Sequence, residues 1–211
     1  MEWKEFETTF SVKLNQQQKE AVQSTKGPVL LLAVPGSGKT TVLVTRLGYM
    51  IYCRNIPPES ILTVTYTVAA TKDMSERFAV RFGEDMAKRL EFRTINGICA
   101  RIIQYYGRRI GKTPFELVKD EKATTGMLIR ICQDPTESDL KNVRTLITYI
   151  KNMMLNEEEL QKLEEESDIR IAGIYREYCR QMREQKLMDY DDQMLYAYNM
   201  LRKDSGVLAY F

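Results

Sequence analysis

Short apolar runs and helical periodicities alternate along the first half of the chain. The run Val29–Val34 is uncharged and Ile61–Thr67 is rich in β-branched residues, so both have the character of buried parallel strands. Each run is followed by a stretch in which apolar residues recur at the spacing of one helix face. This alternation predicts an α/β layer with a parallel sheet. In order, the predicted elements are a helix over Leu14–Ser24, a strand over Val29–Val34, a helix over Thr40–Cys53, a strand over Ile61–Thr67, a helix over Ala69–Phe82, a strand over Phe92–Ile95 and a helix over Ile98–Gly107.

A helical module follows over residues 113–186, where strand signals almost disappear. Residues 72–112 carry 10 basic and 5 acidic side chains, whereas residues 113–168 carry 7 and 13, so the charge changes together with the periodicity. We therefore predict an α/β domain of residues 1–112 and 187–211, with one last helix over Leu187–Phe211, and a helical insertion subdomain of residues 113–186. The insertion's apolar faces are Val143, Leu146, Ile147, Ile150 and Met154, and Ile171, Ile174, Tyr175, Tyr178 and Met182; its expected N-caps are Asp120, Ser138 and Asp168.

The composition is that of an ordinary globular chain. Of its 211 residues, 44% are hydrophobic and 28% are charged, and the formal net charge is +2. No apolar run approaches the ~20 residues that span a bilayer, so we expect no membrane partner. Histidine is absent, which excludes Ser-His-Asp triads and His-ligated zinc sites. The four cysteines are far apart in sequence, which favours reduced thiols in a cytoplasmic protein.

The strongest chemical signal is the segment AVPGSGKT, Ala33–Thr40, between a predicted strand and a predicted helix. This order is typical of a phosphate-binding loop, with Ala33 in place of the usual first glycine. Glycines let successive backbone N–H groups converge on phosphate oxygens at the positive end of the following helix. The predicted nucleotide contacts are Ala33, Val34, Pro35, Gly36, Ser37, Gly38, Lys39, Thr40 and Thr41, with Lys39 on the β- and γ-phosphates and the Thr40 hydroxyl on Mg²⁺.

Upstream of this loop, the segment LNQQQKEAV covers Leu14–Val22. Together with the loop it resembles the amino-terminal part of the UvrD/Rep/PcrA-like superfamily-one DNA helicases, in which a segment LNxxQ precedes the loop at this distance. The resemblance implies that Gln18 reads the adenine edge, for which a side-chain amide offers both a donor and an acceptor. It also implies ATP and Mg²⁺ as cofactors, with Lys39 and Thr40 as the catalytic residues present in this chain.

The segment TYTVAATKDMSERF, Thr65–Phe78, resembles motif Ia of the same family, a strand and helix that contact single-stranded DNA. The resemblance implies that Tyr66 stacks on a base and that Thr67 binds a phosphate. Val68 departs from the pattern, because the family usually has Asn there. A Tyr66 that faces the core from a buried strand is the alternative interpretation.

The segment RTINGICARI, Arg93–Ile102, resembles motif Ib. It implies DNA contacts from Thr94 and from Asn96, which stands where the family usually has His. The excess of basic residues around this segment supports a track for the DNA backbone. The implied partners are therefore single-stranded DNA and duplex junctions, while protein partners stay unknown.

The segment MDYDDQML, Met188–Leu195, resembles the family's DFDD-type segment and is not interpreted as a metal-binding acidic box, because no buried strand precedes it. Asp189 and Asp192 are expected to cap and order a helix start. In the family, the acidic Walker B box follows such a segment by roughly one helix, and a second RecA-like lobe follows later. Neither occurs before Phe211, so we expect this chain to be a fragment of a larger protein.

The resemblance implies an incomplete P-loop RecA-like parallel sheet that carries a helical insertion. The implied parent is an ATP-dependent 3′-to-5′ DNA helicase or translocase with a role in DNA repair, and the fragment alone is expected to be inactive. One alternative is the amino-terminal part of a recombination-type helicase-nuclease. Another is a nucleotide-binding regulator that does not hydrolyse ATP, which requires the gene to end at Phe211.

Overall fold

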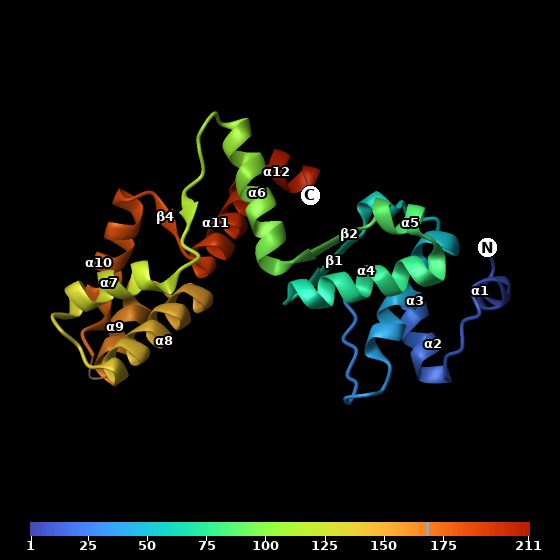
Figure 1. Cartoon of the computed structure of the whole chain (residues 1–211), viewed down its shortest axis with the longest axis horizontal. Helices are drawn as coiled ribbons and strands as arrows, with labels where there is room; N and C mark the ends of the chain where they lie inside the picture. The colour runs from blue at the N-terminus through green and yellow to red at the C-terminus, as the bar shows by residue number, and fades with distance from the viewer. Residues whose placement is uncertain (168) are drawn as a thin grey trace. The chain divides into compact units, whose positions relative to one another are not determined.

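Strand β1 (Leu62–Thr65) pairs in parallel with β2 (Glu91–Thr94), so that Thr65 lies opposite Thr94. The chain crosses from one strand to the other through α4 (Val68–Phe82) and α5 (Glu84–Arg89) (Figure 1). This β-α-β order confirms the predicted α/β character, because parallel neighbours require a crossover connection. Residues that follow either strand therefore lie at the same edge of the pair.

The structure is a computed structural model that describes residues 1–167 and 169–211. The chain divides into two units, residues 1–95 and 96–211, each with its own core. Besides the sheet elements, the first unit contains α1 (Trp3–Thr9), α2 (Gln16–Gln23), α3 (Lys39–Tyr52) and the 3₁₀ turn η1 (Pro58–Ser60). Helix α6 (Ile95–Arg109) begins at the boundary, and all of its residues after Ile95 belong to the second unit. The second unit also contains β3 (Glu116–Leu117), α7 (Glu121–Cys132), α8 (Glu137–Met153), α9 (Glu157–Ser167), α10 (Ile171–Glu184), β4 (Leu187–Met188), α11 (Tyr190–Lys203) and α12 (Ser205–Tyr210).

The core of the first unit is built from the apolar faces of α2, α3 and α4, and is closed by α1. Phe6 of α1 is completely buried and its ring stacks on that of Phe82, with the ring centroids 5.8 Å apart. Phe82 also lies against Gly48 of α3, where an added Cβ would come within 2.2 Å of the ring. A glycine at position 48 is therefore required by this close packing.

The predicted strand Val29–Val34 is wrong for this structure. The segment is extended chain and has no strand partner among the described residues. It keeps the alternation of a strand, because Leu31 packs partly against the core whereas Leu30 and Leu32 are each 82% exposed. A strand needs a neighbour to satisfy its N–H and C=O groups, and local sequence does not reveal whether one is present.

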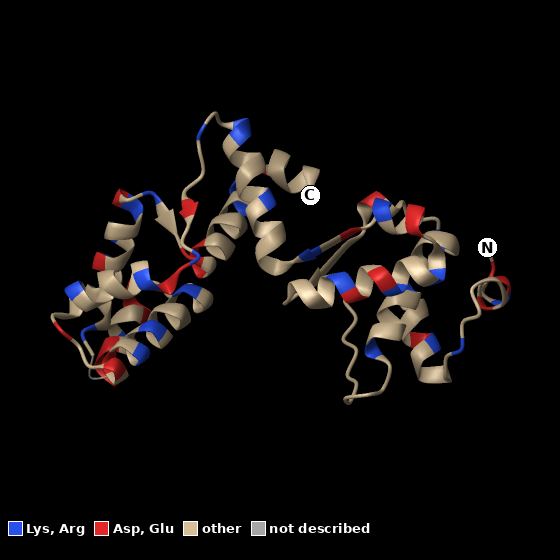
Figure 2. Cartoon of the chain, in the orientation of Figure 1, with Lys and Arg blue, Asp and Glu red and all other residues tan. Residues whose placement is uncertain are grey.

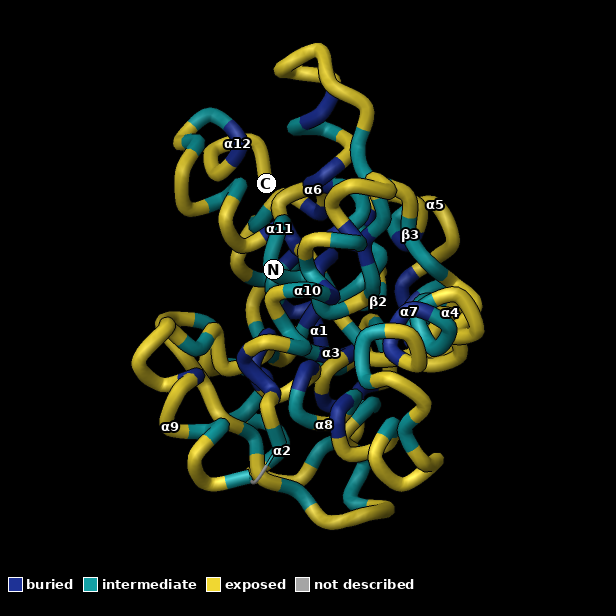
Figure 3. Tube along the Cα trace, turned by 90° about the vertical axis from the view of Figure 1, so that its left-hand side faces the viewer, coloured by how far each residue is buried: buried dark blue, intermediate teal, exposed yellow. Residues whose placement is uncertain are grey.

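The helical part of the second unit has the predicted apolar faces. On α8, Val143, Ile147 and Ile150 are buried in one core with residues of α7, α9 and α10 (Figure 3). Met154 does not belong to this face: it is 53% exposed and adopts a left-handed conformation (φ 53°) as the C-cap of the helix. Helix α9 carries acidic residues at both ends, Glu157, Glu158 and Glu159 in its first turn and Glu164, Glu165 and Glu166 near its last residue. Figure 2 colours all acidic residues red.

The two ends of the helical segment 113–186 are joined by a short parallel pair. β3 pairs with β4, and the flanking backbone bonds run from Glu116 N to Lys186 O (2.8 Å) and from Val118 N to Met188 O (2.9 Å). Two-residue strands leave no periodic signal, so the sequence did not predict this pair. The compact units divide at Ile95, and the assignment of residues 187–211 to the α/β domain stays a prediction.

The observed helix caps agree with the predicted ones at some positions and differ at others. The side chain of Asp120 accepts a bond from Lys122 N (2.9 Å) and caps α7, as predicted. The N-cap of α8 is Thr136 and not Ser138, because Thr136 forms a reciprocal capping box with Asp139. Asp168 lies outside the described residues. The single helix predicted over Leu187–Phe211 is wrong: β4 comes first, and Asp204 ends α11 and caps α12.

The four cysteines are spread over both units of the chain. All four cysteines, each a described residue, are free thiols. Burial raises the pKa of the Cys99 thiol, as expected for an unreactive thiol in the interior. Among residues 1–167 and 169–211, no helix is long and apolar enough to cross a bilayer.

Candidate functional site

The glycine loop, defined here as Ala33–Thr40, connects the extended segment Val29–Val34 to helix α3. Gly36 and Gly38 have φ values of 79° and 84°, in the region that disfavours side chains with a Cβ. Gly38 is the N-cap of α3 and has no side chain with which to cap the helix. The first N–H groups of α3 are thus left for an external anion, which is the chemistry of a phosphate site at a helix N-terminus.

Lys39 folds back over this loop. Its Nζ donates hydrogen bonds to the carbonyl oxygens of Ala33 and Val34, both at 3.0 Å. The Ser37 hydroxyl also donates to Val34 O, at 2.7 Å. The loop is therefore held in a tight turn around its own lysine, and a bound phosphate would compete with two carbonyl groups for the ammonium.

Gln18 lies directly against the glycine loop. Its Nε2 donates to Ser37 O at 3.0 Å, which links α2 to the loop. Its Oε1 accepts from Asn15 N (3.0 Å), while Asn15 Oδ1 accepts from Gln18 N (2.9 Å), so the two residues form the capping box of α2. Gln18 therefore has a structural role that the sequence analysis did not assign, and its adenine contact stays a prediction.

A cleft of about 290 Å³ brings these residues together. It is lined by Asn15, Gln17, Gln18, Leu31, Leu32, Ala33, Val34, Ser37, Lys39 and Val42. A larger cleft of about 640 Å³ lies among α1, α3 and α4, but its lining includes the mutually paired Asp73 and Arg77. Only the smaller of these two clefts is lined by the lysine, the glutamine and residues of the glycine loop.

Thr40 and Thr41 occupy the first turn of α3 and are both half-buried. Within the described residues there is no cluster of three or more His, Cys, Asp or Glu side chains that would hold a metal by itself. Mg²⁺ commonly binds through few protein ligands together with phosphate oxygens and water. A hydroxyl at the end of the glycine loop, such as that of Thr40, fits that mode of binding.

Tyr66 and Thr67 follow β1 directly. Tyr66 is 90% exposed, so the alternative in which it faces the core is wrong for this structure. The Thr67 hydroxyl oxygen accepts from Ala70 N (3.1 Å) as the N-cap of α4. Its O–H hydrogen remains available for a phosphate oxygen, because a hydroxyl can donate and accept at once.

Thr94 ends β2 and lies in register with Thr65, so the structure brings it to the same sheet edge as Tyr66 and Thr67. Asn96 belongs to the second unit, near the start of α6. Its Oδ1 is buried without a hydrogen-bond partner among the described residues. Both assignments as DNA contacts stay predictions.

The basic residues near these motifs are less available than their number indicates. Arg77 donates to both carboxylate oxygens of Asp73 at 2.8 Å. Arg93 donates to Glu91 at 3.1 Å. Such exposed pairs contribute little to stability, but they lower the local positive charge that DNA would encounter.

The fold and these sites define a helix-dominated α/β protein with small parallel sheets. Residues 14–211 match the family model described as the UvrD/REP helicase N-terminal domain. The chain therefore belongs to that family. The match begins after α1, so the aromatic helix that closes the first core lies outside it.

Curated relatives agree with this assignment. The chain is 29% identical over 201 residues to the ATP-dependent DNA helicase PcrA of Leuconostoc citreum, covering 93% of this chain and 27% of the relative. It is 30% identical over 205 residues to the protein of the same name from Staphylococcus epidermidis, covering 94% of this chain and 28% of the relative. The chain thus spans about a quarter of the length of these relatives.

Proposed function

We propose that this chain is the ATP-binding part of an ATP-dependent DNA helicase that moves along single-stranded DNA in the 3′-to-5′ direction. The observation that carries the proposal is the convergence of Lys39 and Gln18 on one glycine loop at the start of α3. A lysine, an amide side chain and an open helix N-terminus are complementary to phosphates and adenine. Family membership and the names of the relatives support the helicase part of the proposal.

The finer fold is also a proposal. We infer that the extended segment Val29–Val34 takes the place of a central strand in a P-loop RecA-like sheet. Its alternating exposure, with Leu30 and Leu32 turned to solvent and Leu31 turned to the core, is the pattern of a strand that lacks a neighbour. The relatives are several times longer than this chain and have further sequence from which such neighbours would come.

In the proposed mechanism, the Lys39 ammonium leaves the carbonyl groups of Ala33 and Val34 and binds the β- and γ-phosphates. The Thr40 hydroxyl would hold Mg²⁺, which would neutralise charge on the transferred phosphoryl group. Gln18 orients the base while it keeps α2 against the loop. The residues that orient the attacking water and complete the site belong, in this proposal, to the rest of the parent protein.

The DNA-binding surface is proposed at the sheet edge that carries Tyr66, Thr67 and Thr94, with Asn96 as a further contact. Tyr66 presents a largely exposed ring to a base, a contact that tolerates any sequence. The hydroxyls of Thr67 and Thr94 suit phosphate oxygens. This surface adjoins the end of β1, and α4 follows it directly.

The proposal is tested by titrating the chain with Mg²⁺-ATP and with Mg²⁺-GTP while recording thermal unfolding. A ligand that binds only the folded state raises the midpoint by an amount that grows with the ratio of ligand concentration to Kd. We expect ATP to raise the midpoint more than GTP does. The absence of any shift with either nucleotide at millimolar concentration would count against a nucleotide site in this chain.

A further inference from the structure

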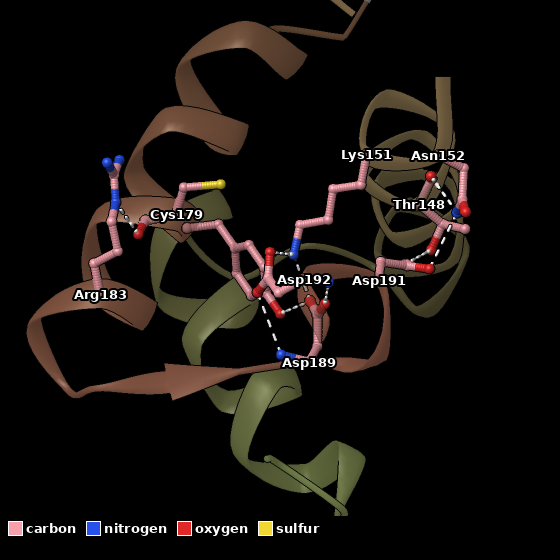
Figure 4. Close-up of polar contacts among 9 residues, drawn as sticks. Thr148, Lys151, Asn152, Cys179, Arg183, Asp189, Asp191 and Asp192 are labelled. Carbon is pink, nitrogen blue, oxygen red and sulfur yellow. Dashed lines mark hydrogen bonds and ion pairs between the residues drawn. The ribbon is translucent and has the colours of Figure 1, made fainter. Parts of the chain in front are cut away.

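Lys151 of α8 is buried beside the apolar residues Ile147 and Ile150. Its side chain is 1% exposed, and its Nζ donates to Asp189 Oδ2 at 2.6 Å and to Asp192 Oδ1 at 2.8 Å (Figure 4). An ammonium is costly to remove from water unless charged partners replace its hydration. The two aspartates supply that replacement from the beginning of another helix, α11.

Two further side chains of α8 contact the same region. The Thr148 hydroxyl donates to Asp191 Oδ2 at 2.9 Å, and Asn152 Nδ2 donates to Asp191 Oδ1 at 3.0 Å. Positions 148, 151 and 152 lie on one face of a helix. One face of α8 therefore contacts three aspartates around the start of α11, at positions 189, 191 and 192.

A third helix completes the cluster. The Tyr178 hydroxyl of α10 donates to Asp189 Oδ2 at 3.0 Å, and Lys151 Nζ lies 5.1 Å from the centroid of the Tyr178 ring. Asp189 Oδ1 meanwhile accepts from Asp192 N at 2.8 Å as the N-cap of α11. Both oxygens of Asp189 thus accept directional hydrogen bonds. These bonds fix the orientation of the start of α11 relative to α8 and α10.

The cluster lies at the junction between the helical segment 113–186 and α11. Asp189 immediately follows β4, which pairs with β3 at the other end of the helical segment 113–186. We propose that Lys151 is a latch that fixes this segment to α11, so that the segment and α11 keep one orientation at their shared junction. The latch is independent of the proposed nucleotide site, since all its residues lie in the second unit.

Stability alone does not account for such a cluster, because well-packed apolar side chains often stabilise a core as well as a buried ion pair does. This difference makes the proposal testable. Lys151→Met leaves the buried carboxylate of Asp192 and the partly buried carboxylate of Asp189 without their cation. The triple variant Lys151→Met, Asp189→Asn, Asp192→Asn removes the charges together, and Asn at position 189 is still a good N-cap.

The measurement is amide hydrogen exchange of Val118, Asp192 and Gln193, whose N–H groups are bonded at this junction. The thermal midpoint is recorded alongside, and Lys141→Met on the exposed side of α8 is the matched control. We expect the triple variant to recover most of the wild-type midpoint while these amides still exchange at least tenfold faster than in the wild type. Wild-type exchange in the triple variant would overturn the latch, and so would wild-type exchange in a folded Lys151→Met. If Lys151→Met does not fold, the triple variant alone decides.

Discussion

Gln18 Nε2 donates a hydrogen bond to the carbonyl oxygen of Ser37, so the helix that would read the base is tied to the loop that would bind the phosphates. The proposed nucleotide site would therefore involve two elements that already contact each other. The same glutamine closes the capping box of α2. A substitution at position 18 consequently has a local structural effect as well as a ligand effect, and the two are separable by the choice of variant.

Gln18→Glu is expected to weaken ATP binding without unfolding α2. Glutamate keeps the oxygen that accepts from Asn15 N, but it loses the amide donor to Ser37 O and to the base. We expect ATP affinity to fall by the equivalent of about 1–2 kcal/mol more than GTP affinity, because the lost bond to Ser37 O and the added negative charge act on both nucleotides, whereas the adenine contact is lost only with ATP. Fluorescence titration of both nucleotides measures this, with Gln17→Ala in the same cleft as the control. An equal fall for ATP and GTP would show that Gln18 is structural only.

Tyr66→Ala is expected to leave the stability of the fold unchanged within about 0.5 kcal/mol, because the side chain is 90% exposed. Binding of single-stranded DNA should weaken by about 1–3 kcal/mol through the loss of base stacking. The salt dependence of binding should stay the same, since no charge is removed. Fluorescence anisotropy with a labelled oligonucleotide measures both, with the exposed Tyr198→Ala as the control. Unchanged DNA affinity in a folded Tyr66→Ala would remove this residue from the proposed surface.

Much of this fold follows from local sequence. The helices α3 and α4 were predictable because their apolar residues keep helical spacing over several turns and flanking turns mark their ends. The capping of α11 by Asp189 was predictable for the same local reason. Helix α1 was missed, because its aromatic residues Phe6 and Trp3 stand among charged residues and their packing depends on distant residues such as Tyr49 of α3 and Phe82 of α4.

Some features of the candidate site can be located from local sequence, whereas others depend on the fold. The glycine loop carries its chemistry in eight consecutive residues, so the sequence locates it directly. The bond between Gln18 and Ser37, and the burial of Lys151, depend on contacts between distant segments. The one local sign of Lys151 is its place on an apolar helix face beside Ile147 and Ile150, where a lysine breaks the pattern.

Leu30→Lys is expected to affect thermal stability differently in this chain and in a longer form of the protein. Leu30 is 82% exposed here, so the substitution should leave the thermal midpoint unchanged and reduce self-association through the exposed apolar segment. In a longer form that supplies the neighbouring strands, the same lysine should destabilise the protein. Leu31→Lys is the control, because Leu31 packs against the core and its substitution should destabilise both forms. If Leu30→Lys leaves the thermal midpoint unchanged in the longer form as well, the RecA-like placement of this segment is contradicted.

Tyr178 predicts how stability changes at alkaline pH. Burial, followed by the negative charge of Asp189, raises the pKa of the Tyr178 hydroxyl above its ordinary value of 10.0. A pKa raised on folding means that this stability is fully present below the ordinary pKa and is lost as the pH rises through and beyond it. Burial raises the pKa of Tyr196 to about 12, with the same sign. Alkaline unfolding should therefore accompany ionisation of these tyrosines.

Circular dichroism and tyrosinate absorbance, recorded from neutral pH upward, measure this coupling. Tyr178→Phe should lower stability at neutral pH by about 0.5–1.5 kcal/mol, through the lost bond to Asp189, and should make the alkaline decline shallower. Tyr198→Phe, on the exposed side of α11, should change neither property. Complete ionisation of all tyrosines near their ordinary pKa with native circular dichroism retained would contradict the burial of Tyr178.

The central claim is that Lys39 and the glycine loop bind the phosphates of a nucleotide. The most direct measurement is the equilibrium binding of a fluorescent ATP analogue to the chain, to Lys39→Ala and to Lys26→Ala, with folding verified by circular dichroism. Lys26 is an exposed lysine shortly before the loop and serves as the matched control. The account predicts at least a tenfold loss of affinity for Lys39→Ala and wild-type affinity for Lys26→Ala. Wild-type affinity in a folded Lys39→Ala would contradict the account.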